Sequence, residues 1–153
     1  MKKLMLFILL GIFVSSCSTD DDVPNIEYGL ASITNSEFPG YFEAGKSYDI
    51  KLTYKLPSSC HTFLGFDGGR EDDSTQEFFI YALTSRNLDL TDCNTDDASL
   101  TKQGTIRNFM ISENVSDDEV FIFKLWTGND SEDNPIYETI EVPVGEPDIE
   151  PAS

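Results

Sequence analysis

Three loops of this chain are rich in the carboxylate and amide oxygens that hard cations such as calcium prefer as ligands. They span residues 67–73, 89–97 and 129–134. None has the EF-hand pattern, which needs acids at alternating positions, a central glycine and a closing glutamate. We expect solvated acidic loops, and we keep a weak calcium site at Asp130, Glu132 and Asp133 as the alternative.

The residues needed for common catalytic sites are largely missing. The single histidine, His61, follows Cys60 and enters an apolar run, which is typical of a packed or partly exposed strand histidine rather than a general base. A serine or cysteine triad therefore lacks its parts. Aspartate and glutamate are so abundant that no chosen pair is informative as a glycosidase pair. We expect a protein that is not an enzyme.

Four aromatic residues lie where strand alternation does not demand burial. They are Phe38, Tyr41 and Phe42, in a turn-like stretch, and Trp126, beside an acidic loop. Large amphipathic rings are enriched in binding surfaces as well as in cores. Two interpretations are open: the rings plug the end of the core, which we favour, or they form a platform for a ligand.

The first 16 residues have the layout of a secretory signal. Lys2 and Lys3 precede an apolar run over 4–14, shorter than the ~20 residues that span a bilayer. The run ends in Val14-Ser15-Ser16-Cys17, which resembles the lipobox of bacterial lipoproteins, where the cysteine is acylated and becomes the new N-terminus. The resemblance implies a lipid anchor at Cys17. The alternative is an ordinary signal with a cysteine nearby by chance.

An acidic run, Asp20, Asp21 and Asp22, follows this cysteine. It resembles the surface-export signals of Bacteroidota lipoproteins, which implies an outer-membrane protein that faces outward. A solvated tether is the second interpretation, because like-charged polar segments stay extended. On either interpretation, residues 17–24 connect the anchor to the domain. Each buried methylene of an acyl chain contributes about 0.8 kcal/mol, so several chains hold a protein firmly at the membrane.

Cys60 and Cys93 remain as an even pair once Cys17 is assigned to the anchor. In an exported, oxidising compartment such a pair predicts a disulfide. Chain-entropy estimates give about 3 to 4 kcal/mol of stabilisation for a loop of this length. Two separate reactive thiols are disfavoured, because neither cysteine has a neighbouring base or cationic cluster that would activate it.

The charge balance excludes several classes of partner. The chain has a formal net charge of −18, and loss of Lys2 and Lys3 with the signal leaves 8 basic against 28 acidic residues, a charge of −20. Nucleic acid is therefore a poor candidate, since its binding depends on cationic contacts to phosphate. Anionic membrane surfaces are disfavoured for the same reason, whereas a cationic protein would be attracted.

Apolar residues recur with period two rather than 3.6. In the clearest segment, 46–56, Tyr48, Ile50, Leu52 and Tyr54 alternate with polar residues, which predicts a strand with one buried face. Six more short runs are bounded by turn-forming clusters: NIEYGLASIT, CHTFLGF, EFFIYALT, TIRNFMIS, EVFIFKLW and PIYETIEVPV. We predict a single all-β domain over 25–145 and a disordered tail over 146–153.

Seven short strands with turns about every ten residues favour a sandwich. In strand count and spacing, residues 25–145 resemble the immunoglobulin-like modules common on bacterial lipoproteins, which implies one antiparallel β-sandwich. The cysteines depart from the pattern of antibody domains, because Cys60 opens the third predicted strand and Cys93 lies in a polar loop. A small lipocalin-like barrel is the alternative fold.

These features together predict a monomeric outer-membrane lipoprotein, exposed at the cell surface, that acts as a non-catalytic binding or assembly component. Its partner would be a protein or a glycan of the cell envelope. The rival interpretation is an acidic, inhibitor-like or capture protein for a cationic secreted partner. No cofactor is expected apart from the candidate calcium.

Overall fold

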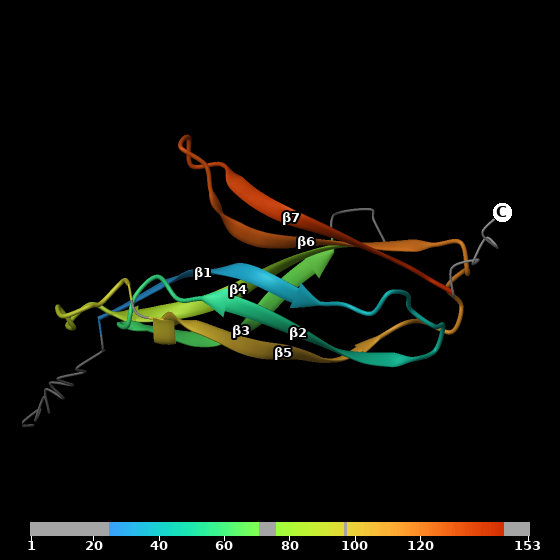
Figure 1. The fold of residues 1–153 in the computed structure, drawn as a ribbon, viewed down its shortest axis with the longest axis horizontal. Helices are drawn as coiled ribbons and strands as arrows, with labels where there is room; N and C mark the ends of the chain where they lie inside the picture. The colour runs from blue at the N-terminus through green and yellow to red at the C-terminus, as the bar shows by residue number, and fades with distance from the viewer. Residues whose placement is uncertain (1–24, 71–75, 97, 146–153) are drawn as a thin grey trace, which may run out of the picture.

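The structure, a computed structural model, describes residues 25–70, 76–96 and 98–145. Within these ranges the chain forms seven β-strands and one short 3-10 helix, and no α-helix (Figure 1). The elements are β1 (Ile26–Glu37), β2 (Ser47–Lys55), β3 (His61–Arg70), β4 (Glu77–Asn87), η1 (Ala98–Leu100), β5 (Thr101–Met110), β6 (Val120–Asn129) and β7 (Pro135–Pro143). The predicted all-β fold is confirmed. The predicted signal (1–16), the tether with Cys17 and Asp20–Asp22, and the tail (146–153) lie outside the described residues.

Alternation along β2 shows how the sequence produces a strand. Ile50, Leu52 and Tyr54 are buried, whereas Asp49 and Lys51 between them are exposed. Successive side chains of a strand point to opposite faces, so this spacing supplies one core face and one solvent face. The predicted strand over 46–56 is therefore confirmed in both its place and its buried side.

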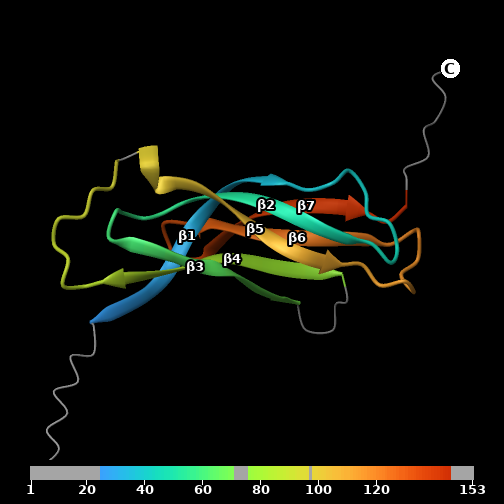
Figure 2. The same cartoon turned by 90° about the horizontal axis from the view of Figure 1, so that it is seen from below.

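β1 belongs to two sheets. Its first half pairs with β4 and its second half with β2, with a shift of register between Ile33 and Asn35. The first sheet is β1–β2–β5, and the second contains β3, β4, β6 and β7. Figure 2 shows β2 and β5 lying over β4 and β6, so the two sheets pack face to face.

The sheet is open, with β5 and β7 at its ends, and β3 pairs only with β4. The sandwich is confirmed and the closed barrel is wrong. One pair departs from the antiparallel expectation, because Glu77–Ile80 of β4 runs parallel to Ile122–Leu125 of β6. Between these strands the chain crosses to the other sheet as β5, and such a crossover allows it to return in the same direction.

The core between the sheets is built around Phe42. This residue is 0% exposed, and its ring centroid lies 4.9 Å from that of Tyr48, 5.6 Å from Phe121 and 6.0 Å from Phe123. Buried rings contribute large apolar areas. The other large, fully buried side chains come from both sheets and from the loop after β5: Ile33, Ile50, Leu52, Thr84, Ile111, Phe123, Leu125 and Val142.

A disulfide joins Cys60 to Cys93, with 5.3 Å between their Cα atoms. It connects the turn before β3 to the loop after β4. Beside it, the Ser59 amide donates to the Asn94 carbonyl at 2.8 Å, and the Asn94 amide donates to the Ser59 hydroxyl oxygen at 2.9 Å. The predicted pairing of the two cysteines is thus present, and two hydrogen bonds reinforce it.

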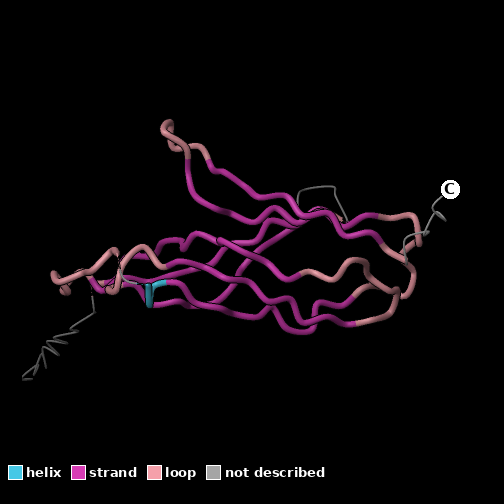
Figure 3. The backbone as a smooth tube through the Cα atoms, in the orientation of Figure 1, coloured by secondary structure: helices cyan, strands magenta, loops and turns pink. Residues whose placement is uncertain are grey.

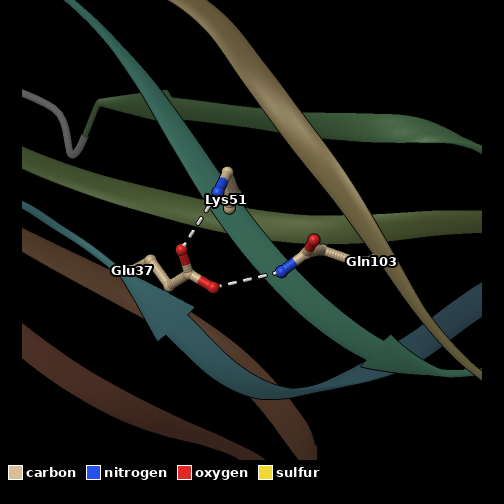
Figure 4. A network of polar contacts seen from close by, with 3 residues as sticks. All are labelled: Glu37, Lys51 and Gln103. Atoms are coloured by element: carbon tan, nitrogen blue, oxygen red, sulfur yellow. Dashed lines mark hydrogen bonds and ion pairs between the residues drawn. The ribbon is translucent and has the colours of Figure 1, made fainter.

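The outer face of the β1–β2–β5 sheet is polar. Figure 4 shows Glu37 of β1 accepting hydrogen bonds from Lys51 of β2 at 3.4 Å and from Gln103 of β5 at 3.1 Å. All three side chains are solvent-exposed, so the contact contributes little to stability.

Loops gather at the two ends of the sandwich, and the β6–β7 hairpin projects beyond the other strands (Figure 3).

Candidate functional site

A cavity of about 330 Å³ opens between the free edges of β3 and β5. Its lining includes Phe66, Phe78, Phe79, Ile80, Ile106, Phe109 and Phe123, together with the 67–70 segment. A second cavity, of about 270 Å³, adjoins it and shares Arg70, Phe78 and Phe109. We call the combined hollow the phenylalanine groove and define it by Phe66, Phe78, Ile106, Phe109 and Met110. Its size and apolar lining are those of a small-molecule site.

The groove begins where β3 and β5 touch. The ring of Phe66 lies against Gly104, where an added Cβ atom would be 2.8 Å from Cε2 of Phe66. Gly104 therefore permits the close approach of the two strands. Toward its C-terminal end β3 rises away from β5 (Figure 1), and residues 66–70 of β3 line the cavity together with Ile106 and Phe109 of β5.

Phenyl rings form the floor and wall of the groove. The Phe78 ring lies 5.6 Å from the Phe123 ring in a stacked arrangement, and 5.5 Å from the Phe109 ring in an edge arrangement. Phe109 also lies 5.4 Å from Phe123. Phe123 is 0% exposed, whereas Phe78 and Phe109 are half-buried. The groove is thus the side of the hydrophobic core on which apolar side chains remain partly exposed to solvent.

Among the described residues that line the groove, Arg70 is the one that carries a positive charge. Its guanidinium carbon lies 5.1 Å from the centroid of the Phe78 ring, a cation–π distance. The residue is exposed and lines both cavities. None of the described carboxylates forms an ion pair with it, since the ion pairs present join Lys51 to Glu37 and Lys124 to Glu77.

The aromatic residues singled out from the sequence lie elsewhere. Phe42 is fully buried at the centre of the core, so its ring presents no surface to a ligand. Phe38 is half-buried, with its ring 4.5 Å from that of Phe123, and Tyr41 is half-buried. Trp126 is half-buried on β6 and donates its Nε1 proton to Asn129 at 3.1 Å. None of these four side chains lines the phenylalanine groove.

The candidate calcium ligands are engaged in a turn. One oxygen of Asp130 accepts hydrogen bonds from the amides of Glu132 and Asn134 at 2.8 and 2.9 Å, and Asn134 holds the pKa of this carboxyl below its ordinary value. Asp133 accepts from the Asn129 side chain at 2.7 Å. In the described part of the chain, no group of three or more histidine, cysteine, aspartate or glutamate residues is placed to hold a metal.

His61 closes the turn before β3. Its Nδ1 lies 2.8 Å from the hydroxyl of Ser58, which also accepts a hydrogen bond from the Cys60 amide at 3.3 Å. Burial, and next the nearby Arg86, lower the pKa of His61. Ser58 is only 5% exposed, so this contact between a serine and a histidine stabilises a turn instead of presenting a nucleophile.

A second aromatic cluster begins at Phe79, which also lines the groove, and extends to Tyr81 and Tyr137. The Phe79 ring is 5.2 Å from that of Tyr137, and the hydroxyls of Tyr81 and Tyr137 are 2.9 Å apart. Burial, and next the hydrogen bond with Tyr137, raise the pKa of Tyr81 to about 12. The cluster connects β4 to β7 and has no cavity of its own among those described.

Sequence reasoning missed the groove residues, although one signal pointed to them. Adjacent phenylalanines at 78 and 79 place one ring on each face of a strand.

Within residues 25–70, 76–96 and 98–145 no helix is long and apolar enough to cross a bilayer. The chain matches no family model, no curated protein and no solved structure.

Proposed function

We propose that this protein is a lipid-anchored module of the bacterial cell envelope that binds a ligand in its phenylalanine groove and catalyses no reaction. The observation that carries the proposal is the groove itself. It is a cavity of about 330 Å³ at which half-buried phenyl rings reach solvent. Concave, mainly apolar sites with few polar groups are the usual form of a ligand site.

Thermodynamics favours an occupant for such a surface. Apolar area removed from water contributes roughly 25 cal/mol per Å², and here that area is already arranged by the two sheets. Phe78 and Phe109 pack against the buried Phe123, so their rings are held in place before a ligand arrives. A preorganised site loses less conformational entropy on binding.

The proposed location comes from the sequence. The ending Val14-Ser15-Ser16-Cys17 supports acylation, and the acidic run at Asp20–Asp22 supports export to the cell surface. The strongly negative charge of the chain keeps it away from anionic bilayers and nucleic acids. The groove would then face the aqueous phase, with residues 17–24 connecting the domain to its anchor.

Site-specific photo-crosslinking in intact cells tests the binding role. Met110, at the rim of the groove, is 74% exposed, and Tyr28, on β1, is 75% exposed. A benzophenone amino acid at position 110 should form specific adducts in the envelope, whereas the matched probe at position 28 should not. Equal labelling at both positions, or none at position 110, contradicts a binding groove.

Replacement of the anchor cysteine tests the location. Cys17→Ala should move the protein from the membrane fraction to the soluble fraction, since the acyl chains supply its membrane affinity. Ser18→Ala is the control and should stay with the membranes. Retention of the Cys17 variant in carbonate-washed membranes contradicts the lipid anchor without bearing on the groove.

A further inference from the structure

The charged groups around the groove are arranged unequally. Asp67 accepts a hydrogen bond from the Gly68 amide at 2.8 Å, and Glu119 accepts hydrogen bonds from the Gln76 side chain and from the Ser116 amide. The two carboxylates in the described part of the lining therefore already accept hydrogen bonds. Arg70, in contrast, contacts the face of Phe78 and forms no ion pair with a described carboxylate. In a strongly acidic chain, the groove thus presents its positive group toward solvent.

The guanidinium carbon of Arg70 lies over the Phe78 ring, 5.1 Å from its centroid. A guanidinium that lies over a ring keeps its N–H donors at its edges, in the fork that matches the two oxygens of a carboxylate. Both cavities include Arg70 in their lining. A carboxylate bound there would therefore sit above the apolar floor formed by Phe78 and Phe109.

The size of the cavity limits the apolar part of the ligand. Its volume of about 330 Å³ lies near the lower end of the range of ligand pockets, about 300 to 1,000 Å³. Rings line it on several sides, and aromatic pairs gain energy from stacked and edge arrangements beyond the area that they bury. A single ring or a short chain suits this space better than a long acyl chain.

We infer that the phenylalanine groove binds a compact apolar carboxylate, with its apolar part among Phe66, Phe78 and Phe109 and its carboxylate on Arg70. This inference rests on the proposed binding function and names the class of ligand. The ligand is held by burial of its apolar part and selected by its charge. Neutral analogues of the same shape bind the same cavity more weakly.

Isothermal titration calorimetry with matched probes tests the inference. Full-length protein is held in lipid nanodiscs, with empty nanodiscs as the blank, and is titrated with 3-phenylpropanoate, its neutral amide and 3-phenylpropylamine. We expect the carboxylate to bind at least about tenfold more tightly than the amide, as is usual for a hydrogen bond to a charged group. Arg70→Gln should remove this preference. Lys55→Gln, which deletes a charge at an exposed site outside the groove, should leave it intact.

Each outcome separates the inference from the function on which it rests. Equal binding of the carboxylate and the amide, or a preference that survives in Arg70→Gln, overturns the role of Arg70 and leaves an apolar binding groove. Tighter binding of the amine overturns the choice of an anion. Absence of binding by all three probes overturns the proposed ligand class. The binding function is tested separately, by crosslinking at position 110.

Discussion

On one long side of the sandwich, β1 crosses from one sheet to the other and so joins them. On the opposite side, β3 and β5 are the outer strands of the two sheets and do not pair with each other. The first, sealed side has further links. The hydroxyl of Ser32 donates to the Thr127 carbonyl at 2.6 Å, and the Phe42 amide donates to the Pro143 carbonyl at 2.8 Å. On the open side Phe66 lies against Gly104, and the groove follows.

This difference shows how one core can serve both stability and binding. On the sealed side, strand pairing excludes water, and Ile33 is 1% exposed. On the open side the same kind of apolar residue is half-buried, as Ile106 and Phe109 show. Apolar groups that the fold leaves partly wet are the ones whose burial a ligand can complete.

The largest expected effect comes from truncating matched residues on the two sides. Ile33→Ala removes buried methyl and methylene groups from the sealed side and should lower the free energy of unfolding by about 2 to 5 kcal/mol. Ile106→Ala, on the open side, should cost less than half as much, because its side chain is partly hydrated in the folded state. Denaturant unfolding of both variants measures the two losses.

Phe42→Tyr serves as a control for the method, because a hydroxyl placed at the fully buried centre should also be strongly destabilising. Equal losses for Ile33→Ala and Ile106→Ala would show that the two sides are packed alike. The groove would then be an ordinary part of the core surface.

The next largest effect concerns the end of the sandwich that carries the disulfide. Cys93→Ser should leave a folded protein that is less stable by about 2 to 4 kcal/mol, since the bridge chiefly restricts the unfolded chain. This loss corresponds to several degrees in melting temperature. Thermal unfolding of the variant, with intact mass after alkylation of the wild type under denaturing, non-reducing conditions, provides the measurement. Alkylation of both Cys60 and Cys93 without reductant contradicts the bridge.

The sequence was sufficient to predict what local patterns and counting determine. Alternation at Ile50, Leu52 and Tyr54 placed β2, because burial of one face leaves a period-two signal. The pairing of Cys60 with Cys93 followed from an even count in an oxidising compartment. Both features depend on a short segment or on the number of residues of one kind.

The groove depends instead on which strand edges remain unpaired, and no local pattern reports that. The crossing of β1 and the parallel pair of β4 with β6 are contacts between distant segments. Phe42 lies in a turn-like stretch and Phe78 in an apolar run, so the local sequence does not predict that Phe42 is the more buried of the two. Only the arrangement of the sheets buries the first and leaves the second at an opening.

A smaller effect should follow from the polar link on the sealed side. Ser32→Ala removes the hydrogen bond to the Thr127 carbonyl, a partly buried contact, and should cost about 0.5 to 1.5 kcal/mol. Thr34→Ala is the matched control, because its hydroxyl lies 3.4 Å from the Thr53 carbonyl in an exposed position. Its effect on the free energy of unfolding should be close to zero. A loss at Thr34 as large as that at Ser32 contradicts a specific seal at the crossing of β1.

The smallest expected effect concerns Tyr81 and Tyr137, which connect β4 with β7. The pKa of Tyr81 tests whether the packing of the sealed side includes these two tyrosines. Burial, and next the hydrogen bond with Tyr137, raise the pKa of Tyr81 to about 12, whereas an unfolded tyrosine titrates near 10. Because the folded pKa is the higher one, this contribution to stability is fully present below pH 10 and is lost as pH rises from 10 to 12. Tyr137→Phe removes the hydrogen-bond partner, so Tyr81 should titrate at lower pH. Ultraviolet absorbance of tyrosinate follows the titration, and Tyr81→Phe identifies its signal. If the signal assigned to Tyr81 titrates near pH 10 in the wild type, these tyrosines are open to water and the packing ends at β6.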